Sequence, residues 1–167
     1  MSDLYQEALA LREELVRWRR WLHSHPELGM DLPETAEYVR AQLEEMGYTV
    51  QSLCGSGLVA LLEGPNPGKT LLLRADMDAL PVQEDSGEPF SSRYPGVCHA
   101  CGHDTHTAML LGAAKLLMAH RSEIRGRVKL VFQPGEEGAG GARAMVSAGV
   151  LESPHVDAAM ALHQVVT

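Results

Sequence analysis

The sequence places side chains of the kinds that bind metal ions at the ends of successive apolar runs. They are Asp76, Asp78, Cys101, His103, Glu136, Glu137 and His163. The steps between these groups match a strand–helix unit of roughly 30 residues. If the runs are strands of a parallel sheet, every group lies beyond the carboxyl end of a strand, where such sheets bind ligands. The spacing therefore predicts one site assembled from several distant segments.

The mixture of thiol, imidazole and carboxylate in this set suits zinc or a similar transition metal, with nickel, cobalt and manganese as alternatives. The candidate ligands are too many for one tetrahedral site, which favours two neighbouring metal ions that share a bridging water. The adjacent carboxylates of Glu136 and Glu137 fit a division of roles. One would bind metal, and the other would stay free to carry a proton.

Two helices are predicted ahead of the first strand. Apolar residues at steps of three and four predict an amphipathic helix from Asp3 to His25, and Pro26 disfavours helix at the residue before it. A second helix is predicted from Pro33 to Met46, with Gly47 as its stop.

From Tyr48 onward the pattern changes to short β-rich runs at 48–54, 58–64 and 70–78, separated by the turn sequences GSG and PNPGK. The irregular stretch 79–100 has the length of a functional loop. A helix capped by Asp104 or Thr105 follows, and its apolar surface predicts burial against a sheet.

The last third of the chain continues the alternation with a strand at 127–134, the Gly-rich segment 135–142 leading into a helix, and a strand at 156–163. Strands that alternate with helices predict an α/β fold in which helices flank a largely parallel sheet.

Composition narrows the class of protein. Lys and Arg total 14 against 22 Asp and Glu, so the formal charge of −8 argues against a nucleic-acid partner. The apolar runs are shorter than the ~18 residues of a membrane span, and the N-terminus lacks the basic start of a signal peptide. Three cysteines do not make a disulfide framework. We expect an acidic, globular, cytoplasmic protein.

Five ordered motifs carry a family resemblance: RRWLHSHPELG, RADMDALP, HACGHDTHTA, QPGEEGAGGARAMV and ALH. They resemble the dinuclear metal-dependent amidohydrolases and metallopeptidases, which include N-acyl-amino-acid aminoacylases, hippurate hydrolases, indole-3-acetyl-amino-acid hydrolases and carboxypeptidase G-like enzymes. The resemblance implies a zinc-exopeptidase-like fold and a substrate that is an N-acyl amino acid or short peptide. It also implies two divalent metal ions, with zinc expected first and manganese, cobalt or nickel as alternatives.

The resemblance also assigns roles to individual residues. It implies Glu136 as the general base and Asp78 as a supporting residue of the catalytic site. It implies four metal ligands, which are Cys101, His103, Glu137 and His163.

The chain departs from the family pattern at three points. Asp76 stands where some relatives carry a histidine ligand, and Thr105 replaces a glycine at a helix start. Family members are also much longer. The resemblance therefore implies that residues 1–167 are the N-terminal part of an incomplete catalytic domain. The resemblance implies that a smaller dimerisation domain and a last metal-binding histidine follow this part. It also implies that the full-length form is a homo-oligomer.

Other interpretations compete with these roles. Cys98 and Cys101 form a C-x-x-C pair typical of redox or zinc-ribbon sites, but the sequence has no second such pair. His163 could be a core histidine, and Glu136–Glu137 a solvated first helical turn. His106 could equally line the site or cap its helix, whereas His23 and His25 are interpreted as structural.

Two alternative functions remain open from the sequence. One is a metallo-dipeptidase or carboxypeptidase of the same family. The other is a catalytically silent fragment that binds metal. Hydrolysis of an amide bond between an acyl group and an amino acid is the preferred hypothesis.

Overall fold

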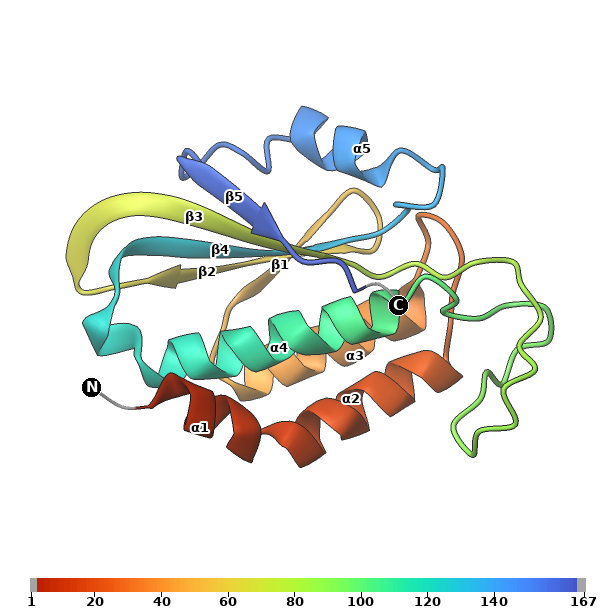
Figure 1. Cartoon of the computed structure of the whole chain (residues 1–167). Coiled ribbons are helices and arrows are strands. Elements are labelled where there is room, and N and C mark those ends of the chain that lie inside the picture. Colours follow the sequence, from red (N-terminus) through yellow and green to blue (C-terminus); the bar gives the residue numbers. More distant parts are fainter. Residues whose placement is uncertain (1–2, 165–167) are drawn as a thin grey trace.

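The computed structural model describes residues 3–164, which form a five-stranded sheet with helices on both faces (Figure 1). The strands lie in the order β1-β2-β4-β3-β5. β2 is antiparallel to β1 and β4, whereas β3 is parallel to β4 and β5. Within residues 3–164, β2 alone runs against the others, which confirms the predicted α/β fold with a largely parallel sheet. The strands are β1 Val50–Leu53, β2 Gly57–Glu63, β3 Asn66–Asp76, β4 Arg125–Gln133 and β5 Ala158–Ala161.

Helices α1 to α4 lie on one face of the sheet and α5 lies on the other (Figure 1). Successive side chains of β4 point to opposite faces of the sheet. Leu130 and Phe132 pack on the side of helices α1 to α4, and Val131 packs on the side of α5. The helices are α1 Leu4–Ala10, α2 Arg12–Ser24, α3 Pro33–Glu45, α4 His103–Ala119 and α5 Gly141–Ser147, with a short 3-10 helix, η1, at Arg121–Glu123. In residues 3–164 no helix has the length and apolar character needed to cross a membrane.

The helix expected over residues 3–25 is interrupted at Leu11, which ends α1 and precedes α2. α1 has no buried residue, whereas α2 buries Trp18 and Leu22 in the core. The end of α2 at Ser24 agrees with the effect predicted for Pro26.

Two further boundaries differ from the sequence-based expectations. The segment PNPGK is not all turn, because β3 begins at Asn66; a Cβ at Gly68 would lie 2.8 Å from the backbone nitrogen of Gly126, so glycine permits this close strand approach. α4 begins at His103 rather than near Thr105, because Gly102 precedes it in the left-handed conformation (φ 85°). Asp104 is therefore buried in the first turn and does not cap the helix.

A buried lysine holds the chain in place ahead of β5. Lys129 of β4 donates hydrogen bonds to the carbonyl oxygens of Val150, Glu152 and Pro154 at 2.8, 2.9 and 2.9 Å. Burial lowers the pKa of this ammonium group. Its three donors therefore fix the segment that leads into β5.

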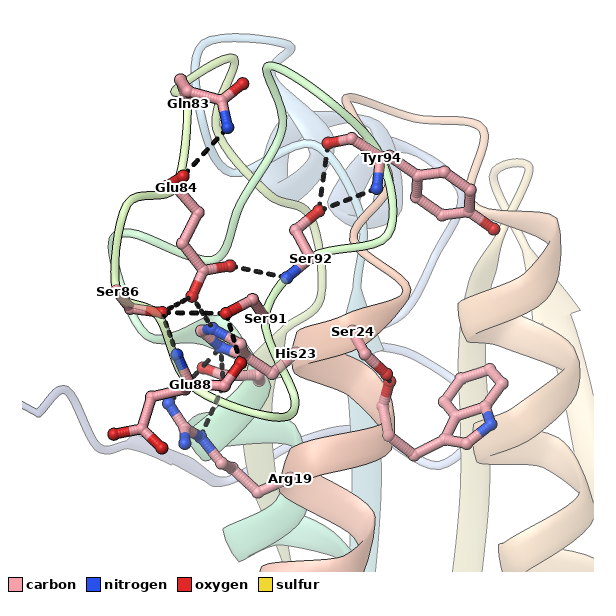
Figure 2. A network of polar contacts seen from close by, with 12 residues as sticks. Arg19, His23, Ser24, Gln83, Glu84, Ser86, Glu88, Ser91, Ser92 and Tyr94 are labelled. Atoms are coloured by element: carbon pink, nitrogen blue, oxygen red, sulfur yellow. Dashed lines mark hydrogen bonds and ion pairs between the residues drawn. The ribbon is translucent and has the colours of Figure 1, made fainter.

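The irregular segment 79–100 is tied to the helices by a polar network (Figure 2). Asp104 Oδ2 lies 2.8 Å from His23 Nδ1 and 2.7 Å from Arg19 Nε. His23 Nε2 lies 3.1 Å from Glu84 Oε1. The bond to Asp104 raises the pKa of His23, against the opposing effect of burial, so the imidazolium bridges two carboxylates.

Glu84 organises the loop itself. It accepts a hydrogen bond from the backbone N–H of Ser92 at 2.6 Å and another from the hydroxyl of Ser86. Burial would raise the pKa of Glu84, but these bonds and His23 outweigh it and lower the pKa to about 2. The ionised form is therefore favoured by folding.

We predict that Glu84→Gln lowers the free energy of unfolding by about 1–3 kcal/mol at pH 6, where Glu84 is ionised and His23 is protonated. A depressed carboxyl pKa contributes stability above its ordinary value of 4.5, and that contribution is lost as the pH falls towards about 2. Urea unfolding from pH 6 downward measures the difference, which should shrink below pH 4.5. The exposed Glu88 of the same loop provides the control Glu88→Gln, and an equal loss in both variants would contradict the assignment.

A second prediction concerns β5, which pairs with β3 and has no other neighbour among residues 3–164. Met160 and Leu162 are 50% and 62% exposed at this edge. Exposed edge strands promote pairing between chains, so we expect the chain to self-associate and Met160→Lys to shift it towards monomer in sedimentation velocity. Val146→Lys on α5 is the matched control, and a monodisperse parent monomer would contradict the prediction.

Candidate metal centre

The centre is built around the buried imidazole of His103. His103, the first residue of α4, is 1% exposed, and neither ring nitrogen has a hydrogen-bond partner within residues 3–164. Its Nε2 lies 3.7 Å from Asp76 Oδ2 and 3.7 Å from Glu136 Oε2. Glu137 Oε1 is 3.8 Å from the same nitrogen. Three carboxylates thus converge on one side of the ring.

Asp78 occupies the other side of this ring. Its Oδ1 lies 3.5 Å from His103 Nδ1 and also accepts the backbone N–H of Glu136 at 2.9 Å. Its Oδ2 accepts the backbone N–H of Glu137 at 2.9 Å. Burial would raise the pKa of Asp78, but His103 and these backbone donors outweigh it and lower the pKa. The carboxylate therefore links the end of β3 to the turn after β4.

The turn that carries the two glutamates follows β4 and precedes α5. Gly135 has a positive φ of 64°, and a Cβ at Gly141 would lie 1.7 Å from the carbonyl oxygen of Pro134, so this turn needs glycine at both places. The Glu136 side chain is 42% exposed and that of Glu137 is 26% exposed. Glu136 is thus the more accessible of the two.

Cys101 and His163 complete the cluster. Cys101 Sγ lies 3.4 Å from His163 Nε2, and the other ring nitrogen of His163 donates to the carbonyl of Gln164 at 2.6 Å. Burial, together with the carboxylates of Glu137 and Glu136, raises the pKa of the Cys101 thiol to about 11. A cation placed here would reverse that electrostatic effect, since thiolate is the form that binds metal.

The residues fit a metal ion on geometric and chemical grounds. Donor atoms lie within 4.8 Å of one another in three groups that share His103. Burial alone would lower the pKa of His103, but Asp78 and Asp76 outweigh it and raise the pKa. A divalent cation bound here would compensate the charge of the clustered carboxylates and accept the lone pair of the buried imidazole. The groups are Cys101–His103–His163, Asp76–His103–His106 and His103–Glu136–Glu137.

The structure therefore brings together the six residues to which the family resemblance assigns roles, which are Asp78, Cys101, His103, Glu136, Glu137 and His163. Asp76 and His106, which are not among the four predicted ligands, join His103 in the same cluster. His106 Nδ1 lies 2.7 Å from Asp76 Oδ1 and its ring centroid is 5.5 Å from that of His103. The available signal was the spacing of three between the histidines, which puts both on one face of a helix.

The remaining candidates lie outside this cluster. His23 contacts Asp104 and Glu84, and His25 contacts Ser24 and Arg93, so neither belongs to the metal groups of the described residues. Cys98 is buried, and its backbone pairs with Leu80. The cysteines of the C-x-x-C pair are both free.

Comparison with known proteins gives a consistent result. Residues 72–166, more than half of the chain, match the profile of peptidase family M20/M25/M40. The chain is 44% identical to an N-acyl-L-amino acid amidohydrolase of Geobacillus stearothermophilus over 92% of its own length and 41% of that protein. It is 43% identical to thermostable carboxypeptidase 2 of Saccharolobus solfataricus, covering 98% of this chain and 42% of the relative.

A solved structure agrees with these relatives. The YXEP protein of Bacillus subtilis, a dinuclear metal-binding peptidase of the M20 family, superposes with a TM-score of 0.89 at 42% identity. The match covers 93% of this chain and 44% of that protein, so the chain spans about two fifths of the length of the relatives it matches. The resemblance carried by the five sequence motifs is confirmed: the chain belongs to peptidase family M20/M25/M40.

Proposed function

We propose that the chain supplies the catalytic centre of a metal-dependent hydrolase that cleaves the amide bond of N-acyl amino acids. The observation that carries the proposal is His103, which is buried without a hydrogen-bond partner among the described residues where the carboxylates of Asp76, Glu136 and Glu137 converge. The amidohydrolase relative from Geobacillus stearothermophilus supports this substrate class.

The proposed ligands of the centre are those implied by the family motifs. Cys101, His103, Glu137 and His163 would hold two divalent ions, with zinc proposed first because thiol and imidazole donors suit it. When bound, such ions polarise a carbonyl oxygen and lower the pKa of a water molecule to about 7.

Glu136 is proposed as the general base. It is the more exposed of the paired glutamates, and its carboxylate lies beside His103. Its backbone N–H donates to Asp78, which would hold the turn that carries the Glu136 side chain. Glu136 would take the proton of the attacking water and deliver it to the leaving amine.

The domain organisation and setting follow the same proposal. Residues 1–167 would form the N-terminal part of the catalytic domain of a longer, homo-oligomeric cytoplasmic enzyme. The share of the relatives' length that the chain covers, about two fifths, supports this correspondence. The substrate would be a small molecule, with neither nucleic acid nor membrane as partner.

A metallo-carboxypeptidase or dipeptidase is the second candidate. It is favoured by the similar identity to the carboxypeptidase of Saccharolobus solfataricus, and the same centre would serve a peptide bond. Assay of the metal-loaded protein with N-acetyl amino acids and with dipeptides separates the candidates. Faster turnover of dipeptides would overturn the preferred substrate class.

We predict that Cys101→Ser weakens metal binding by more than the roughly 10- to 100-fold typical of losing a partner outside the coordination sphere, because a neutral hydroxyl replaces a thiolate ligand. Competition with a chromogenic chelator and metal analysis of the dialysed chain measure the change. Cys98→Ser in the same C-x-x-C pair is the matched control and should retain the parent affinity. Equal losses in both variants would instead support a site that uses the pair.

We predict that Glu136→Gln lowers kcat by about 10²–10⁴-fold while the metal content is unchanged, because the amide keeps the shape and removes the base. Glu137→Gln is the comparison and should lose metal together with turnover. Normal turnover by Glu136→Gln would exclude it as the base. Bound metal without turnover in the parent chain would support the catalytically silent alternative.

A further inference from the structure

A buried carboxylate–imidazole pair lies next to the proposed metal ligands. Asp76, the last residue of β3, and His106, in the first turn of α4, are both almost fully buried. Asp76 Oδ2 accepts a hydrogen bond from Arg74 Nη1 at 2.7 Å, and Oδ1 lies 2.7 Å from His106 Nδ1. The hydroxyl of Thr107 donates to the Asp76 carbonyl at 2.9 Å. Arg74 and His106 therefore hold the two carboxylate oxygens, and Thr107 holds the backbone of the same residue.

These contacts assign the position of the proton on His106. A carboxylate paired with Arg74 is an acceptor, so His106 Nδ1 carries the hydrogen of this bond. The other nitrogen, Nε2, is then an acceptor, and it receives the backbone N–H of Gln164 at 3.0 Å. Both ring nitrogens are used, so His106 is not available as a metal ligand in this arrangement.

The peptide unit of Gln164 passes this constraint to His163. His163 Nδ1 donates to the Gln164 carbonyl at 2.6 Å, which leaves Nε2 with its lone pair on the side of Cys101 Sγ, 3.4 Å away. That tautomer is the one in which Nε2 can bind a metal ion. The chain of contacts thus runs from Asp76 through His106 to the imidazole of a proposed ligand.

The segment after β5 needs such an anchor. β5 has four residues, all of them exposed, and His163 and Gln164 are also exposed. A Cβ at Gly102 would lie 2.1 Å from Gln164 Nε2, so the side chain of Gln164 lies against the start of α4. The contact with His106 fixes its backbone at that point.

We propose that Asp76 and His106 form a positioning pair that orients His163 for metal binding through the peptide unit of Gln164. The inference rests on the proposed function, because it takes His163 as a ligand of the metal centre. Partners that orient a ligand from outside the coordination sphere commonly change metal affinity by about 10- to 100-fold when they are removed.

The first test reads the tautomers directly in the metal-free chain by long-range ¹H–¹⁵N correlation of the histidine rings. We expect the proton on Nδ1 in both His106 and His163. In Asp76→Asn, the amide oxygen can still accept from Arg74, and the amide NH₂ then faces Nδ1 of His106. The proton of the His106 ring should therefore move from Nδ1 to Nε2, where it would face the backbone N–H of Gln164. A His106 proton on Nε2 in the parent, or an unchanged tautomer in Asp76→Asn, would overturn the inference.

The second test titrates the 167-residue chain with Co²⁺ and follows the thiolate-to-cobalt absorption of Cys101. His106→Phe preserves an aromatic ring and removes both hydrogen bonds, and Asp76→Asn is the isosteric variant should His106→Phe fail to fold. We expect about 10- to 100-fold weaker binding and an altered absorption spectrum in both. His155→Phe, at an exposed histidine, is the matched control and should behave as the parent.

The outcomes separate this inference from the proposed function. Parent and variants that bind Co²⁺ with equal affinity and equal spectra would overturn the positioning role and leave the metal centre intact. A parent chain that binds no Co²⁺ would overturn the proposed function and this inference with it.

Discussion

The candidate centre depends on one buried carboxylate, that of Asp78. Its two oxygens accept the backbone N–H groups of Glu136 and Glu137, and one of them also faces His103. A buried carboxylate or backbone N–H costs free energy if it has no hydrogen-bond partner, and here the carboxylate and the N–H groups are partners of one another. The end of β3, the turn after β4 and the start of α4 are thereby fixed at the same point, although they are far apart in the sequence.

The parallel arrangement of β3, β4 and β5 makes this meeting possible. Their register brings Asp76 level with Gln133 and Arg74 level with Ala161, so the segments that follow all leave the same edge of the sheet. This part of the architecture could be predicted from sequence, because apolar runs, turn residues and the repeat of ligand types all report it. The same holds for the grouping of Cys101, His103 and the two glutamates.

The parts that sequence patterns did not predict depend on long-range contacts. Asp104 looked like a helix cap, but its burial beside His23 follows from a contact between distant segments. The start of β3 at Asn66 depends on the close approach of Gly68 to Gly126, which no local propensity reports. Asp76 and His106 were left outside the predicted ligand set because their partnership appears only when β3 and α4 are placed together.

The first turn of α4 explains why these separate features form one site. His103 faces the carboxylates of the centre, while Asp104 binds the imidazole that fixes the loop 79–100. His106 reaches the segment after β5, and Thr107 binds the backbone at the end of β3. Successive side chains of a helical turn point in different directions, so one turn can hold several segments at once. A rigid first turn would therefore fix the ligands, the loop and the sheet edge together.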